Sequence, residues 1–200
     1  MSTRKFLTLY EVSAMLTAVS EAPNSERNQC IIMMAFIHGF RVSELLSLQL
    51  SDLDLRSRIV QVSRMKNGFS TVHPLTPREI RALRVWMRVR QTIMTKSGNE
   101  DEGWLFITWR GGHLSRQQGY NIISQAGRRA GLSINAHPHM LRHACGYALA
   151  DNGVDTRLIQ DYLGHRNIRH TVRYTASSAA RFEGIWQSVR RRRQQIDPFC

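Results

Sequence analysis

Apolar residues in the first fifty positions recur at the three- and four-residue spacing of amphipathic helices. Thr8 and Glu11 form a capping box, a side-chain pattern that starts helices, and the apolar positions after it predict a helix over about 9–20. A second helix is expected through 31–36 as far as a bend at Gly39, after which helical spacing resumes. The N-terminal part of the chain is therefore predicted to be helical.

Residues 58–75 instead alternate between apolar and polar on both sides of Asn67-Gly68, a dipeptide that favours a tight hairpin turn. This pattern predicts two antiparallel strands with Lys66 at the tip of the hairpin. The stretch SDLDL, just before the hairpin, is expected to turn the chain. The stretch WLFIT, over 104–108, is expected to add a third short strand.

The rest of the chain is predicted to be helical, with residues that favour helix starts and ends at the boundaries. Thr76, Pro77 and Glu79 predict a helix that ends near 92, before the polar loop TKSGNEDEG. Further helices are expected from Ser115 to Gly131, from Pro138 to Gly153 and from Asp155 to Gly164. After Gly164, helical spacing through Ile168, Val172 and Thr175 predicts one more. The predicted fold class is mainly α with a small three-stranded antiparallel sheet (α+β), in a single domain over 1–200.

The net charge of the chain indicates which class of molecule it binds. Its 200 residues carry 28 Lys and Arg against 15 Asp and Glu, and this net charge of +13 favours a polyanion such as nucleic acid. The cysteines Cys30, Cys145 and Cys200 form no CxxC pair, which fits a reducing cytoplasm. No leader-like start or membrane-length apolar run is present in the sequence, so we expect a cytoplasmic, nucleoid-associated protein without a membrane partner.

The stretch HPHMLRHACG, residues 137–146, concentrates three histidines and an arginine, which indicates either a metal or a phosphate ligand. His139 and His143 are spaced like zinc ligands on one helix face. A metal is disfavoured, because Arg142 would place a permanent positive charge beside it and no glutamate is present there as a base. A phosphate instead needs converging cations and donors, which are available in Arg41, Lys66, His139, Arg142 and His165. We therefore expect no metal and no cofactor.

Each of these residues also has an ordinary structural interpretation. Arg41 can pair with Glu44 at a helix start, Lys66 can be a solvated turn residue, and Tyr174 can be a packed aromatic. Their combination indicates catalysis, because phosphoryl transfer through the protein needs a nucleophile and Tyr174 is the candidate. A phenol, with a pKa of about 10, must have cations or a base nearby before it can attack.

The motifs GFRVSEL, the lysine in MKNG, HMLRH, LGH and RYT occur in the order and approximate spacing of the tyrosine recombinase (phage integrase) family, which this chain resembles. Longer stretches, notably KNGFSTVHPL and DTRLIQDYLGHRNIRHTVRYTAS, look more narrowly like fimbrial phase-switch DNA invertases. The resemblance covers nearly the whole chain and implies the family's catalytic-domain fold. It also implies a site-specific recombinase that inverts a promoter segment between short inverted repeats and so controls fimbrial phase variation.

The catalytic residues implied by this resemblance are Arg41, Lys66, His139, Arg142, His165 and the nucleophile Tyr174. The two arginines would clamp the scissile phosphate, and His165 would donate a further hydrogen bond to it. Lys66 would protonate the leaving 5′ hydroxyl. His139 would assist proton transfer from Tyr174, which would form a 3′-phosphotyrosyl bond.

Supporting roles are expected for neighbouring residues. Glu44 is expected to orient Arg41 or His139, and His143 is expected to be a buried supporting histidine rather than a catalyst. Contacts to the DNA backbone are expected from Arg64, Arg116, Arg166, Arg169 and Arg173. The implied partners are double-stranded DNA with short inverted repeats, further copies of the chain in a homotetramer, and accessory DNA-bending proteins.

The ends of the chain depart from many members of the family. Arg41 lies too near the N-terminus for the helical core-binding domain that those proteins carry, so none is expected. Residues 181–200 are expected to form a C-terminal extension whose apolar stripe contacts a neighbouring subunit, with packing on its own domain as the alternative. The alternative functions are a transposon or plasmid recombinase, a non-cleaving DNA-binding regulator on the same fold, and a type IB topoisomerase.

Overall fold

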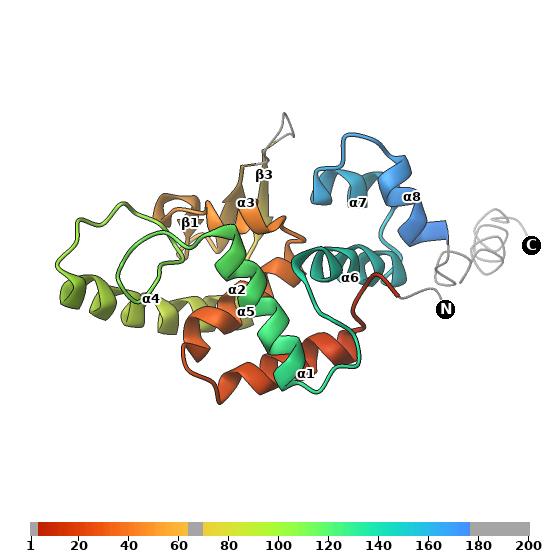
Figure 1. The fold of residues 1–200 in the computed structure, drawn as a ribbon. Helices are drawn as coiled ribbons and strands as arrows, with labels where there is room; N and C mark the ends of the chain where they lie inside the picture. Colours follow the sequence, from red (N-terminus) through yellow and green to blue (C-terminus); the bar gives the residue numbers. More distant parts are fainter. Residues whose placement is uncertain (1–3, 64–69, 177–200) are drawn as a thin grey trace, which may run out of the picture.

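The computed structural model of the protein describes residues 4–63 and 70–176, and Figure 1 shows a helical body with a small sheet along its upper edge. The helices are α1 (Leu9–Ser20), α2 (Ser25–Ile37), α3 (Val42–Leu46), α4 (Pro77–Ser97), α5 (Arg116–Arg129), α6 (Pro138–Asp151), α7 (Thr156–Leu163) and α8 (Arg169–Ala176). The strands are β1 (Leu53–Asp54), β2 (Ile59–Val62) and β3 (Thr71–Pro74), and a 3-10 helix, η1 (Leu50–Asp52), precedes β1. The predicted fold class is confirmed.

Side-chain caps begin several helices where the sequence predicts them. The hydroxyls of Thr8, Thr76 and Ser115 each accept a hydrogen bond, at 3.2 Å, from the backbone N–H three residues further on. The carboxylate of Asp155 accepts the N–H of Arg157 at 2.7 Å. Each bond satisfies an amide that the first helical turn leaves without a partner, so the predicted starts of α1, α4, α5 and α7 are confirmed.

The predicted end of α4 near residue 92 is wrong, because the helix continues to Ser97. Ile93 and Met94 are buried and extend the apolar inner face by one more turn. Gly98 then ends the helix with a φ of +67°, a left-handed conformation that glycine adopts without strain. The first residues of the predicted polar loop therefore belong to the helix.

The sheet has the order β1-β2-β3, with both pairs antiparallel. The predicted hairpin strands are confirmed, and their last described pair joins Val62 to Thr71. Lys66, at the predicted tip, lies outside the described residues. The third strand is β1, where SDLDL was expected to turn the chain. Residues 104–108 are not a strand: the enclosed side chains of this segment lie consecutively rather than on one face, and it contributes isolated bridges only.

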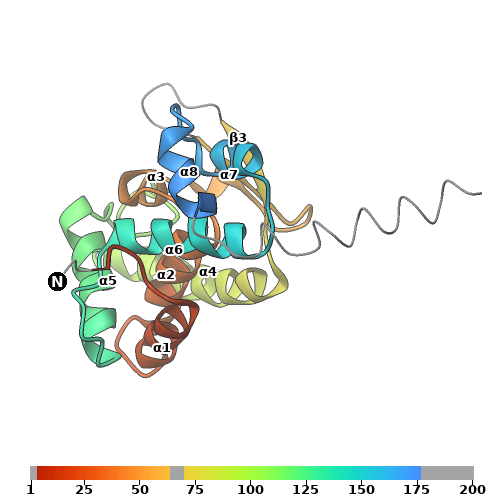
Figure 2. The ribbon, with the colours of Figure 1, turned by 90° about the vertical axis from the view of Figure 1, so that its right-hand side faces the viewer.

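Two apolar clusters lie inside the body. The larger one extends from α1 to α6, and α2 lies at its centre, in contact with both α4 and α6. The smaller one gathers α7 and α8 against the other side of α6, and its buried residues are Cys145, Ala150, Ile159, Leu163 and Tyr174. In both views α7 and α8 stand above α6 (Figures 1 and 2). We call α7, α8 and the segment between them the α7–α8 module.

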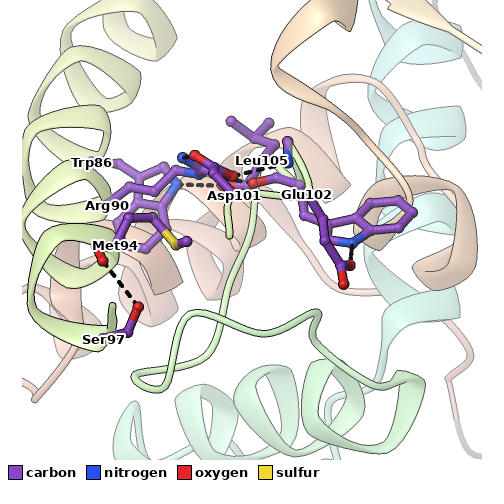
Figure 3. A network of polar contacts seen from close by, with 9 residues as sticks. Trp86, Arg90, Met94, Ser97, Asp101, Glu102 and Leu105 are labelled. Carbon is purple, nitrogen blue, oxygen red and sulfur yellow. Dashed lines mark hydrogen bonds and ion pairs between the residues drawn. The ribbon is translucent and has the colours of Figure 1, made fainter. Parts of the chain in front are cut away.

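The inner face of α4 is fixed to the segment that follows the helix (Figure 3). Arg90, which is 2% exposed, donates from Nε to the carbonyl of Trp104 at 2.8 Å and from both Nη atoms to the carboxylate of Asp101. Trp86 donates from Nε1 to the carbonyl of Leu105 at 2.9 Å. These bonds satisfy a buried cation and two carbonyls in a segment that has no strand pairing of its own.

The helix predicted after Gly164 is present as α8, but of the three positions that carry the predicted spacing only Thr175 is buried. Ile168 and Val172 are exposed, whereas Thr171, Tyr174 and Thr175 are buried. The helix turns its hydroxyl-bearing face inward because those groups find partners there; Thr175, for example, accepts from Thr156 Oγ1 at 2.9 Å. Among the described helices, none has the length and apolarity needed to cross a membrane.

Candidate active site

Glu44 is a buried carboxylate that serves two of the predicted phosphate-binding arginines. Its side chain is enclosed on α3, where Oε2 accepts the backbone N–H of Arg41 at 3.0 Å. Its other oxygen, Oε1, lies 2.5 Å from Nη1 of Arg41, and Nη1 of Arg142 lies 3.9 Å from Oε2. A carboxylate at this place holds two guanidinium groups near one another, which their mutual repulsion would otherwise oppose.

Arg142 joins separate parts of the chain. It lies on α6, is 3% exposed, and donates from Nη1 to the carbonyl of Gly39 and from Nη2 to the carbonyl of Leu163 at 2.6 Å. Gly39 has a φ of +58°, and a Cβ there would collide with Leu163. Glycine is therefore needed at this bend, both for the backbone conformation and for the close approach of α7.

Tyr174 is fully enclosed in the smaller cluster, with 0% of its surface exposed. Its hydroxyl lies 2.8 Å from Nδ1 of His143, and its ring meets the ring of Tyr147 edge-on at 5.1 Å. A Cβ at Gly146 would lie 2.6 Å from the ring, so α6 needs a glycine where the ring packs against it. Burial raises the pKa of Tyr174, against the opposing charges of Arg173 and Arg142.

His165 follows α7 and lies beside the nucleophile candidate. Its ring stacks on that of Tyr174 at 6.2 Å, and its Nδ1 lies 2.9 Å from the hydroxyl of Thr171. Burial, followed by the charges of Arg142 and Arg41, lowers the pKa of His165 to about 3. The imidazole is therefore neutral at neutral pH and can offer one N–H to a phosphate oxygen.

His143 and His139 lie on α6 in different surroundings. Burial, followed by the charge of Arg173, lowers the pKa of His143 to about 4, so this imidazole is neutral while it contacts Tyr174. His139 is exposed, and its ring pairs with that of His137 at 6.5 Å. Partial desolvation of its ring, followed by the charges of His137 and the nearby arginines, lowers the pKa of His139. In this structure it is His143, rather than His139, that contacts the tyrosine hydroxyl.

The predicted site residues therefore fall into two adjoining groups. One contains Arg41, Glu44 and Arg142, and the other contains His143, His165 and Tyr174. The two groups lie side by side, because Arg142 and His143 are neighbours on α6 and Arg142 donates to the carbonyl of Leu163, two residues before His165. The proposed backbone contacts Arg116, Arg166, Arg169 and Arg173 are all exposed, whereas Lys66 and Arg64 lie outside the described residues.

Three residues at the site are not among the sequence candidates. Gly39 and Gly146 make room for Leu163 and for the ring of Tyr174, and Thr171 holds the ring of His165. The sequence signals for two of them are the bend at Gly39 and, for Gly146, a glycine inside a predicted helix, which marks a close approach. Within residues 4–63 and 70–176, no group of three or more His, Cys, Asp or Glu side chains is arranged to hold a metal ion.

Comparison with known proteins identifies the family of this chain. The model of the phage integrase family matches residues 5–181. Two type 1 fimbriae regulatory proteins of Escherichia coli K12 are similar over most of their length. FimB is 52% identical over 191 residues, covering 96% of this chain and 94% of that protein. FimE is 54% identical over 187 residues, covering 94% and 93%.

A solved recombinase structure has a similar fold. The crystal structure of XerA recombinase superposes with a TM-score of 0.77 at 25% identity, covering all of this chain and 68% of that one. The family model spans most of the sequence, and among the described motif residues Arg41 lies with Arg142, and His165 with Tyr174. The chain therefore belongs to the phage integrase family and is a tyrosine-type site-specific recombinase that acts on DNA.

Proposed function

We propose that this recombinase inverts a promoter segment between short inverted repeats and thereby controls fimbrial phase variation, by cutting and rejoining DNA through Tyr174. The proposal is supported by the similarity over nearly the whole chain to two proteins named as regulators of type 1 fimbriae. The observation that carries the chemistry is the hydroxyl of Tyr174, 2.8 Å from a neutral imidazole and beside Arg142. A transposon or plasmid recombinase is the less favoured function.

The reaction forms a bond between Tyr174 Oη and the scissile phosphorus and breaks the bond from phosphorus to the 5′ oxygen. Arg41 and Arg142 bind the non-bridging oxygens, and His165 donates its N–H to one of them. These contacts stabilise the charge that develops as the phosphorus is attacked. Lys66 supplies the proton that the leaving 5′ oxygen takes up.

The proton of Tyr174 has two candidate acceptors on α6. Because the ring is fully enclosed, Tyr174 must leave its position before it can touch a phosphate. While docked it is bonded to His143, and once moved toward the clamp it comes within reach of His139, which is exposed on the same helix. We assign His143 to holding the resting nucleophile and His139 to the attack itself.

A nicked suicide substrate tests the nucleophile. Tyr174→Phe should fold and bind DNA normally but form no covalent adduct on a denaturing gel, because it lacks the attacking oxygen. Tyr147→Phe is the matched control, since it removes a hydroxyl from the neighbouring ring and should retain the adduct. An SDS-resistant complex with the Tyr174→Phe protein would exclude this residue. Sequencing of recombination junctions from cells with and without the protein identifies the repeats.

The role of Lys66 is separable from simple phosphate binding. Lys66→Ala should be defective on a normal 5′ oxygen ester but largely recover on a bridging 5′ phosphorothiolate, whose sulfur leaves without a proton. Equal defects on both substrates would make this lysine a phosphate contact only. Cleavage should also persist in excess EDTA, because the proposed machinery contains cations and neutral donors and no metal ligands.

The proposed assembly on DNA is a homotetramer aided by accessory DNA-bending proteins. Residues 181–200, which lie outside the described residues, are assigned to contacts between subunits. Truncation before Arg181 should leave a monomer that binds one half-site and fails to form synaptic complexes in native gels. Misfolding and aggregation of the truncated protein, measured by light scattering, would instead mean that the segment packs on its own domain.

A further inference from the structure

The outer face of α4 carries a row of arginines that the proposed reaction does not use. Arg78, Arg81, Arg84 and Arg88 are all exposed, and their spacing places them along one side of the helix. Arg88 lies ten positions after Arg78, which corresponds to about 15 Å of helix at about 1.5 Å per residue. We call this row the α4 arginine stripe.

The stripe carries charge that nothing in the described structure neutralises. None of its four side chains makes an ion pair or hydrogen bond with another described residue, whereas other exposed arginines do, as in the pair of Arg157 and Asp161. The one carboxylate of α4 is Glu79, which is buried on the inner face, 2.8 Å from His38 Nε2. Glu26 on α2 faces Arg78 and Arg81 across an open groove of about 440 Å³, but no ion pair joins them.

Arg90 on the same helix is a structural arginine, and its surroundings differ from those of the four exposed arginines. Arg90 points inward, and the segment around Asp101 takes up its donors (Figure 3). Together with Trp86 it fixes the inner side of α4 to the body. The stripe is therefore a row of cations on a rigid support, with its donors directed toward solvent.

The stripe faces away from the candidate active site. The inner face of α4 packs on α2, and α2 also packs on α6, which carries Arg142. In both views α4 lies below α7 and α8 (Figures 1 and 2). A duplex whose scissile phosphate lies between Arg41 and Arg142 therefore cannot use the same stretch of backbone to reach the stripe.

We propose that the α4 arginine stripe binds the phosphate backbone of a second stretch of duplex DNA, outside the crossover site. Arginine forks bind phosphate oxygens two at a time, and a row of them releases counterions from the duplex without reading bases. An acidic protein is the less favoured partner, because protein interfaces need an apolar centre and Val85 is the one large exposed apolar residue on α4. One part of this inference rests on the proposed function, namely that the second stretch of duplex flanks the crossover site.

The test measures binding to a random-sequence duplex over a range of salt concentrations. Replacing all four stripe arginines with glutamine should weaken binding roughly tenfold or more, because up to four phosphate contacts are lost. The slope of log affinity against log salt should become shallower by up to about 3.6, from about 0.9 per phosphate. Glutamine keeps the helix propensity of arginine, so the melting temperature should not change.

The matched control replaces Arg128 and Arg129, which are exposed at the end of α5, with glutamine. If the salt dependence of the control variant becomes shallower by the same amount per replaced arginine, the proposal is overturned, because any surface cation would then have the same effect. An unchanged slope in the stripe variant would also overturn it and would favour an acidic protein. Adduct formation by Tyr174 on a short suicide substrate should be equal in the wild type and the stripe variant. If neither protein forms the adduct, the proposed function is refuted and the stripe proposal is not.

Discussion

The two apolar clusters of this recombinase differ in size, and the difference separates the parts of its active site. The larger cluster, which we call the frame, packs α1 to α6 and holds Arg41 and Glu44. The smaller cluster has five fully buried residues and contains Tyr174. Regions with few buried contacts open at lower cost than the rest of a protein. Arg41 and Glu44 of the proposed phosphate clamp are therefore held by the more stable region, and the proposed nucleophile by the less stable one.

The strongest test of this comparison is a cavity in the frame. Trp86→Ala removes an enclosed indole and its bond to Leu105, which should lower the free energy of unfolding by about 3–5 kcal/mol. Denaturant titration would measure the loss. Because the whole frame is one cluster, hydrogen exchange should accelerate in α2 and α6 together; faster exchange confined to α4 would contradict a cooperative frame.

A cavity in the module should act locally. Leu163→Ala removes a buried side chain from the smaller cluster and should cost about 2–5 kcal/mol, expressed first as opening of α7 and α8. Hydrogen exchange should rise in these helices while α2 keeps its protection. Equal acceleration in α2 would show that the frame and the module unfold as one unit.

A smaller change should move the nucleophile alone. Gly146→Ala places a Cβ 2.6 Å from the ring of Tyr174, and overpacking of this kind costs about 1–3 kcal/mol. The ring should become accessible to a tyrosine-modifying reagent, with faster exchange in α8. Gly127→Ala is the matched control, because its Cβ would come equally close to that of Ala136 in the frame, and it should leave the reactivity of Tyr174 unchanged.

The smallest expected effect is a pH dependence confined to the module. The pKa of His143 is about 4 and that of His165 about 3, below the ordinary value of about 6.5. As the pH falls below 6.5, the unfolded state takes up protons first, so stability is lost down to about pH 4 and 3 respectively. Exchange in α8 should therefore be faster at pH 5 than at pH 7, and His143→Gln should make this dependence shallower.

Local signals in the sequence predict local structure well in this protein. The caps at Thr8, Thr76 and Ser115 and the Asn67-Gly68 hairpin depend on neighbours within a few residues, and the elements they predict are present. The strand expected over 104–108 fails because the partners of this segment, such as Arg90 on α4, are set by the tertiary fold.

The candidate site divides in the same way. The residues proposed for it, among them Arg41, Arg142 and Tyr174, are predicted from the order of the sequence motifs that resemble the family. The partner of the Tyr174 hydroxyl could not be predicted from motif order. His143 lies 31 residues away, and the contact depends on which face of α8 turns inward. Apolar spacing favours the face of Ile168 and Val172, whereas the side that turns inward is the neighbouring one, where Thr171, Tyr174 and Thr175 are buried and Thr175 has a hydroxyl partner.

The guanidinium of Arg142 bridges carbonyls of Gly39 in the frame and Leu163 in the module. The guanidinium group that is proposed to bind the phosphate thus also connects the two regions. Thermodynamic reciprocity follows: if the position of the module changes the affinity of the clamp for phosphate, then phosphate changes the position of the module by the same free energy. Under that condition, binding of DNA at the proposed clamp and the docking or release of Tyr174 are one coupled equilibrium.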